Sequence, residues 1–210
     1  MSFTKDTLVK VMTCCSKLME ENKQYLIDLD SALGDGDLGL TMTAGFAEGL
    51  SFVSQSSETD LGKLTMQMGM AISKKVPSTM GTLVASGFMG AGKSAKGLSE
   101  LNAEQIAAFM DAFVAGVMNR GKAAPGDRTL VDSLHPAAKA LKKAIADGAD
   151  LKDSFKVALE AAQAGVEATK TMKPKFGRAV YYGEQVLGKE DQGAVVGKLI
   201  FEGFTQAVCD

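Results

Sequence analysis

Residues 29–41 read LDSALGDGDLGLT and combine three aspartates with three glycines in one short stretch. Asp35 and Asp37 stand at alternate positions, each next to a glycine, so they repel one another unless a cation lies between them. Oxygen-only ligands favour a hard divalent ion, and Mg2+ is the usual choice where phosphate oxygens complete the shell. We therefore predict Asp30, Asp35 and Asp37 as metal ligands. A solvated acidic turn is the alternative, because Gly and Asp are common turn residues.

Two other motifs overlap this stretch, and neither fits its context. Gly34, Gly36 and Gly39 spell G-x-G-x-x-G, but no β-branched run precedes them, and carboxylates between the glycines would repel a bare pyrophosphate. An EF-hand loop counted from Asp35 would end at Phe46, which cannot ligate calcium. The metal interpretation therefore stands ahead of both.

The composition is that of one globular domain over residues 1–210. The chain is 46% hydrophobic and 23% charged with a net charge of −2, which recommends neither a nucleic-acid nor an anionic-membrane partner. It has no apolar run of about 18 residues, and its N-terminus alternates charged with apolar residues, so we expect neither a signal peptide nor a membrane span. Cys14, Cys15 and Cys209 lack metal-ligand spacing and suit a reduced cytoplasmic protein, as buried small apolar groups.

Apolar residues recur at helical intervals along almost the whole chain, and period-2 alternation is scarce. We therefore predict an all-α fold, an antiparallel up-and-down helical barrel or bundle. Thr4 and Asn102 are the expected N-caps of two helices. The predicted helices contain residues 8–19, 22–29, 38–52, 61–72, 106–117, 134–145, 151–166 and 195–208.

Glycine-rich loops separate these helices at five places: residues 29–41, 76–82, 119–129, 176–179 and 190–194. In an up-and-down bundle alternate loops fall at the same end, so several of them could share one rim. Carboxylates, backbone N–H groups at helix N-termini and Arg178 would then surround one anion, as a nucleotide diphosphate requires.

Residues 87–94, GFMGAGKS, satisfy the Walker A pattern G-x-x-x-x-G-K-S, and residues 82–86 could be the strand before it. However, Gly97 soon interrupts any helix that would follow, and other parallel strands are missing. We expect a chance match in a chain with 23 glycines. A P-loop ATPase would be supported only if Lys93→Ala destroyed nucleotide binding.

Four spaced motifs together resemble a known family, the nucleotide-binding L subunit of bacterial dihydroxyacetone kinase. The motifs occur in the family's order between residues 29 and 194, and the chain length suits a free-standing L subunit. The resemblance implies a barrel of antiparallel helices capped at one end by ADP or ATP, with Mg2+ held by aspartates. The similar segments are LD at 29–30 with GDGDLG at 34–39, RGKA at 120–123, PGDRT at 125–129, and GRA at 177–179 with GE at 183–184, Gly188, Asp191 and GA at 193–194.

The resemblance also implies roles for individual residues. Asp30, Asp35 and Asp37 would hold Mg2+, and Arg178 would reach phosphate. Positioning and charge neutralisation are the main demands of phosphoryl transfer, so no catalytic side chain is implied. The implied nucleotide contacts are the phosphates for Leu38, Gly39, Leu40, Thr41, Thr79 and Met80, the adenine side for Gly121 and Leu130, and closure over the nucleotide for Asp191, Gln192 and Gly193.

The family's ketose is bound by a separate K subunit, so a partner is implied; a homodimer also stays open. Leu38 replaces the usual His, Met80 replaces a phosphate-contacting serine, and Gln192 replaces a proline. These changes leave open whether the acceptor is dihydroxyacetone or another short ketose. They also leave open whether a phosphotransferase-system relay recharges bound ADP or ATP exchanges freely. A non-catalytic nucleotide-binding regulator is the alternative function.

Several other polar residues have less specific signals. His135 is the only histidine, and we expect a structural role for it rather than phosphorylation. Basic residues near the loops could attract phosphate, but such side chains are usually solvated; they are Lys122, Arg128, Lys173 and Lys175. Tyr181 and Tyr182 could pack on the core or on a lid.

Overall fold

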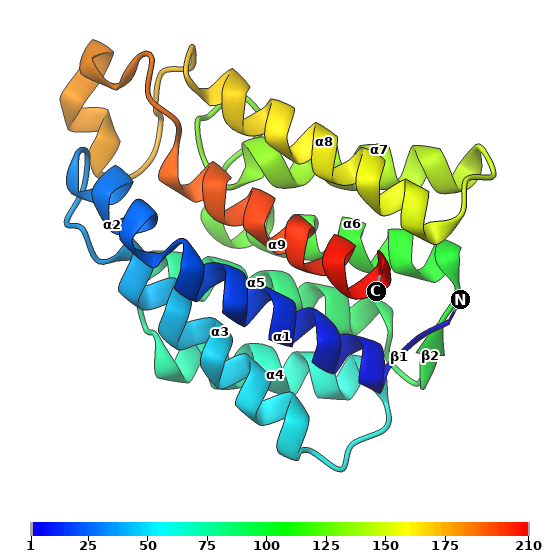
Figure 1. The fold of residues 1–210 in the computed structure, drawn as a ribbon. Helices are drawn as coiled ribbons and strands as arrows, with labels where there is room; N and C mark the ends of the chain where they lie inside the picture. Colours follow the sequence, from blue (N-terminus) through cyan, green and yellow to red (C-terminus); the bar gives the residue numbers. More distant parts are fainter. Residues whose placement is uncertain (1, 210) are drawn as a thin grey trace.

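The computed structural model describes residues 2–209, and this part of the chain is almost entirely helical (Figure 1). The predicted all-α class is confirmed. The one pair of strands joins two short extended segments, Phe3 to Leu101 and Thr4 to Glu100, in antiparallel register. The elements are β1 (Phe3–Thr4), α1 (Lys5–Glu21), α2 (Lys23–Ser31), α3 (Leu38–Gln55), α4 (Leu61–Lys75), α5 (Thr79–Ser94), β2 (Glu100–Leu101), α6 (Ala103–Gly121), α7 (Val131–Ala146), α8 (Leu151–Thr169), the 3₁₀ segment η1 (Arg178–Val186) and α9 (Gln192–Cys209).

The long helices close into a barrel. α1 packs on α3, each following helix from α3 to α9 packs on the next, and α9 returns to pack on α1. The short α2 lies outside this ring and packs mainly on α3. In Figure 1 the loop after α2 and the orange η1 segment lie together at one end of the barrel, whereas β1 and β2 lie at the opposite end. The 29–41 loop is therefore held at one mouth of the barrel.

Local sequence signals set the helix starts. Thr4 and Asn102 both form the predicted caps, each as a capping box in which side chain and backbone bond reciprocally with the third helical residue. Asp60 and Asp150 cap α4 and α8 more simply, because each side chain accepts one hydrogen bond from a backbone N–H of the first helical turn. Helices α3 and α4 begin at Leu38 and Leu61, as predicted.

The periodicity missed α5, and this helix contains the whole Walker A match. Residues 79–94 are helical, so residues 82–86 form no strand and residues 87–94 form no phosphate loop. The glycines instead allow close packing between helices: a Cβ at Gly90 would lie 2.5 Å from the Ala112 carbonyl oxygen, and one at Gly116 would lie 2.3 Å from that of Ser86. Small residues therefore replace the apolar stripe that predicts a helix.

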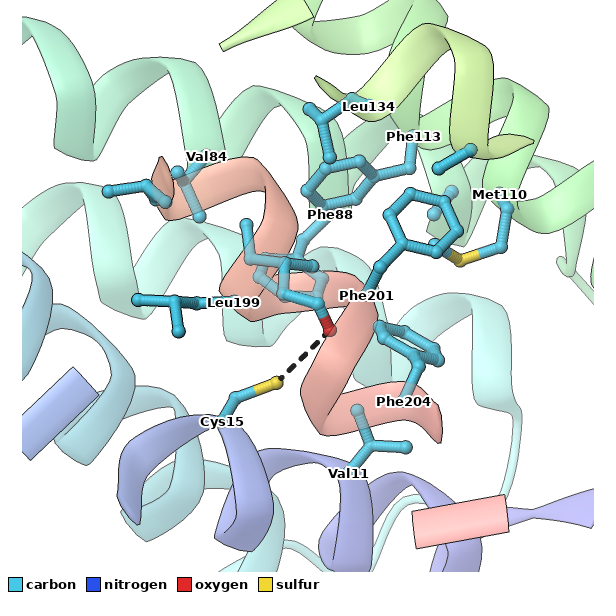
Figure 2. Packing of buried hydrophobic residues seen from close by; sticks show 14 of the residues in the cluster. Val11, Cys15, Val84, Phe88, Met110, Phe113, Leu134, Leu199, Phe201 and Phe204 are labelled. Atoms are coloured by element: carbon cyan, nitrogen blue, oxygen red, sulfur yellow. Dashed lines mark hydrogen bonds between the residues drawn. The ribbon is translucent and has the colours of Figure 1, made fainter. Parts of the chain in front are cut away.

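Helix α9 is apolar on almost all sides because it is buried by α1, α7 and α8. Figure 2 shows Phe201 on this helix among Phe88, Phe113 and other core side chains. The Phe88 and Phe113 rings meet edge to face with centroids 5.0 Å apart. Cys15 is fully buried as predicted, and its thiol lies 3.8 Å from the Ile200 carbonyl oxygen, which accepts its weak hydrogen bond; Cys14 and Cys209 are only half-buried.

Across residues 2–209, every helix is too short or too polar to cross a bilayer.

Candidate functional site

The three aspartates of the 29–41 loop come together around one point. Oxygen atoms of Asp30, Asp35 and Asp37 all lie within 4.8 Å of one another. Asp30 is buried in the last turn of α2, 7% exposed, and its Oδ2 accepts the backbone N–H groups of Asp37, at 3.0 Å, and of Leu38, at 3.3 Å. The turn is therefore folded back on Asp30, and the other two carboxylates project at the surface.

Glycines make this turn possible. Gly36 has φ +74°, a left-handed conformation that is strained for residues with a Cβ. A Cβ at Gly39 would lie 2.2 Å from the Lys23 carbonyl oxygen, so the first turn of α3 can approach α2 only without a side chain there. These two glycines thus serve the geometry of the acidic cluster.

The acidic cluster places three carboxylates beside one arginine, Arg178. Desolvation, followed by the charges of Asp35 and Asp30, raises the pKa of Asp37 above its usual value, and Arg178 opposes this shift. Arg178 Nη2 lies 2.9 Å from Asp35 Oδ2. One guanidinium therefore balances part of the negative charge, and a divalent cation would balance the rest.

A cavity of about 610 Å3 opens beside the cluster. Four of the five glycine-rich loops contribute to its walls, so the predicted meeting of loops at one rim is confirmed for these four. Its volume lies in the range of small-molecule and cofactor sites. The predicted contact residues that line it are Thr79, Met80, Gly121, Leu130, Asp191, Gln192 and Gly193.

Residues 38–41 lie at the acidic cluster rather than in this cavity. Leu38 donates its N–H to Asp30 and is buried, whereas the Leu40 side chain is 54% exposed. Thr41 donates its N–H to the Asp37 carbonyl oxygen, as expected inside a helix. The first turn of α3 is thus placed beside the three aspartates, with its N-terminal end toward them.

Gln192 connects the acidic cluster to the cavity. Its Nε2 lies 3.3 Å from Asp30 Oδ1, and the same side chain lines the cavity. Its Oε1 is buried and, among the described residues, has no hydrogen-bond partner. A buried acceptor without a partner costs ~1–3 kcal/mol, so it favours a ligand that donates a hydrogen bond there.

Arg128 is a cavity residue whose burial the sequence interpretation missed, because basic residues near the loops were expected to be solvated. The side chain is instead 1% exposed and lines the cavity. Its Nη1 lies 3.7 Å from Asp191 Oδ2 and has no hydrogen-bond partner among residues 2–209. Its backbone φ of +60° is rare for a residue with a side chain and costs about 1–3 kcal/mol.

Asp191 titrates in an unusual range. Burial raises its pKa from 3.8 to about 6, although the Ala194 N–H and the Arg128 guanidinium favour the ionised form. Between about pH 4 and 6 the folded protein therefore holds a proton that the unfolded chain has released. The stabilising contribution is fully present below about pH 4 and is lost as the pH rises through 6.

We therefore expect the stability difference between wild type and Asp191→Asn to depend on pH. Asn can still cap α9, so the substitution removes mainly the titration. Relative to Asp191→Asn, wild type should lose on the order of 2–3 kcal/mol between pH 4 and pH 7. Urea unfolding at both pH values measures this, and an identical difference at the two pH values would contradict it.

The remaining polar residues lie elsewhere. His135 lines a separate cavity between α6 and α7, outside the site. Lys175 pairs with Asp127 at 2.6 Å, and Lys173 pairs with Glu184 at 3.0 Å. Tyr181 is 90% exposed, so it packs neither on the core nor under a lid.

The fold and the site together define an all-α barrel protein in which a cluster of three carboxylates lies beside a cavity at one end of the barrel. The comparisons agree with this class: residues 32–206 match the DAK2 domain. The chain belongs to the DAK2 domain family.

Its relatives extend over nearly the full chain. It is 31% identical over 206 residues to the ADP-binding subunit DhaL of PEP-dependent dihydroxyacetone kinase 1 from Listeria innocua serovar 6a, with 98% of each chain covered. The ADP-binding subunit DhaL of the PEP-dependent enzyme from Escherichia coli K12 is 29% identical, with 92% of each chain covered. The resemblance to the L subunit family is thus confirmed.

A solved structure shares the fold. The dihydroxyacetone kinase of C. freundii in complex with AMP-PNP and Mg2+ superposes with a TM-score of 0.73 and 25% sequence identity. The match covers 94% of this chain and 33% of that kinase, so this chain spans about a third of the longer protein.

Proposed function

We propose that this protein is the Mg2+-dependent ADP- or ATP-binding subunit of a kinase, which transfers a phosphoryl group to dihydroxyacetone or a similar short ketose. The observation that carries the proposal is the junction at Gln192, which contacts the buried aspartate and lines the cavity. A metal-bridged nucleotide requires this adjacency of carboxylates and a nucleotide-sized cavity. The full-length similarity to ADP-binding subunits supports the same function.

Asp30, Asp35 and Asp37 fit magnesium in ligand type and spacing. All three offer carboxylate oxygens, and these oxygens lie within 4.8 Å of one another. Bound there, Mg2+ would neutralise charge on the phosphate oxygens. The chain itself orients the carboxylates through Asp30, which holds the turn by two backbone hydrogen bonds.

In this proposal different residues contact different parts of the nucleotide. The N-terminal turn of α5, with Thr79 and Met80, and that of α3, with Gly39 and Leu40, would donate backbone N–H groups to phosphates, and Leu38 and Thr41 would lie beside them. Gly121 and Leu130 would lie against the adenine. Arg178 would reach phosphate from its position at Asp35, and residues 191–193 would close over the nucleotide.

The partners proposed are a ketose-binding K subunit and, for recharging ADP, a relay protein of the phosphotransferase system. The relative from Lactococcus lactis is named a PTS-dependent kinase subunit, which supports the relay. Such a subunit would act in the cytoplasm. We propose no homodimer.

A non-catalytic nucleotide-binding regulator is the second candidate. The Met80 side chain favours it, because it lines the cavity and reaches Gly193, where its Cε would lie 3.1 Å from an added Cβ. This bulk stands where the family usually has a small hydroxyl side chain.

Calorimetry and a transfer assay test these two functions. The purified protein should bind ADP in the presence of Mg2+ and bind it far more weakly in EDTA. With a cognate K subunit and its ketose, a kinase subunit turns over, whereas a regulator binds nucleotide without turnover. Failure to bind ADP with Mg2+ would refute both.

A further inference from the structure

Residues 170–190 form a lid segment between α8 and α9, beside the mouth of the barrel. Its two ends are tied by a hydrogen bond from the Gly188 N–H to the Lys170 carbonyl oxygen, 2.8 Å. Val186 and Ala179 pack with Leu33 in a small cluster separate from the main core. The lid segment therefore has little apolar packing of its own to hold it, which is typical of parts that open locally.

Arg128 supplies several polar attachments of the lid segment. Its Nε donates to the Thr169 carbonyl oxygen at 3.2 Å, on the last residue before the segment. Its Nη2 lies 3.0 Å from the carbonyl oxygen of Lys189 and 3.4 Å from those of Val186 and Glu190. One buried side chain thus holds both ends of the segment.

Only an arginine can make this set of contacts. The guanidinium has five N–H donors in a fixed planar fork, so it can donate to several carbonyl groups at once and still present another edge. The remaining nitrogen, Nη1, is buried 3.7 Å from Asp191 Oδ2 and has no hydrogen-bond partner in the described structure, and Arg128 as a residue lines the cavity. The same charge therefore contacts the lid segment on one side and borders the cavity on the other.

We propose that Arg128 is a positioning residue that couples occupancy of the cavity to ordering of the lid segment. This inference rests on the proposed function, since the ligand considered is a nucleotide diphosphate with Mg2+. An anionic ligand accepts a hydrogen bond from Nη1, and the fixed guanidinium then holds the carbonyl groups of residues 186–190 more firmly. Order in the lid segment and nucleotide affinity consequently change together, as coupled equilibria must.

Hydrogen exchange and calorimetry with ADP and Mg2+ test the coupling. In wild type, ADP with Mg2+ should slow exchange in residues 171–189. Arg128→Lys keeps a positive charge but cannot hold several carbonyl groups, so lid-segment exchange in the free protein should rise about tenfold or more. Exchange in α4 should not change. ADP affinity should fall about tenfold, and ADP should no longer slow exchange of the lid segment.

Two further variants keep the test decisive. Val186→Ala loosens the lid segment from its apolar side without touching the cavity, and it should also weaken ADP binding. Lys173→Met removes an ion pair within the segment but none of the contacts of Arg128, so exchange and affinity should stay within about twofold of wild type.

The possible outcomes separate the claims. Faster lid-segment exchange with unchanged ADP affinity, in Arg128→Lys or Val186→Ala, would make Arg128 a purely structural tie and overturn the coupling. The same holds if wild type binds ADP while exchange of the lid segment is unaltered. If wild type binds no ADP, the proposed function itself fails.

Discussion

Changing Asp35 and Asp37 together to Asn is expected to abolish Mg2+-dependent ADP binding while leaving the helices folded. Both carboxylates are exposed and hold no helix, whereas Asp30 keeps the turn in place through two backbone N–H groups. Loss of two anionic ligands removes most of the attraction for a hard cation. Affinity for ADP in Mg2+ should fall on the order of 100-fold or more, to the level seen in EDTA.

Calorimetry, with circular dichroism for helix content, measures both halves of this result. Removing two like charges should leave the thermal stability of the metal-free protein unchanged or slightly higher. Asp28→Asn is the matched control, an exposed aspartate on the adjoining helix α2 that should bind ADP like wild type. Retained tight binding in the double variant would refute the metal site. Lys93→Ala should also bind normally, because Lys93 is an exposed residue of α5 and not part of a phosphate loop.

Much of the fold could be predicted because local signals and burial agree. Thr4 and Asn102 each present a capping residue followed by an apolar stripe, so propensity and packing favour the same helix start. The acidic cluster was predictable for another reason. Asp35 and Asp37 repel one another across Gly36 unless a positive charge compensates them, and this chemistry is local in sequence.

The parts that could not be predicted depend on contacts between distant residues. Arg128 has an ordinary loop neighbourhood in sequence, yet it is buried because residues 169 and 186–191 fold over it. The only local signal was its place in the motif PGDRT, which marks a family position but not burial. Helix α5 was missed since its glycines meet the backbone of α6, and a stripe of small residues produces no hydrophobic period.

Gly116→Val should therefore be among the most destabilising single substitutions in this protein. A Cβ at Gly116 would lie 2.3 Å from the Ser86 carbonyl oxygen and 3.2 Å from the Gly87 Cα. These are backbone atoms of α5, so they can yield only if the two helices separate. We expect this overpacking to lower the free energy of unfolding by about 3 kcal/mol, measured by urea denaturation.

Two companion substitutions isolate the contact. Ala115→Val places a valine at the preceding residue of α6, on its exposed face, and should cost only about 0.5 kcal/mol through helix propensity. Gly116→Ala gains about 1 kcal/mol of helix propensity, yet its Cβ already overlaps the Ser86 carbonyl, so a net loss is still expected. Equal costs for Val at positions 115 and 116 would mean that α5 and α6 are not in backbone contact. The glycines of the Walker A match could then not be explained as a packing surface.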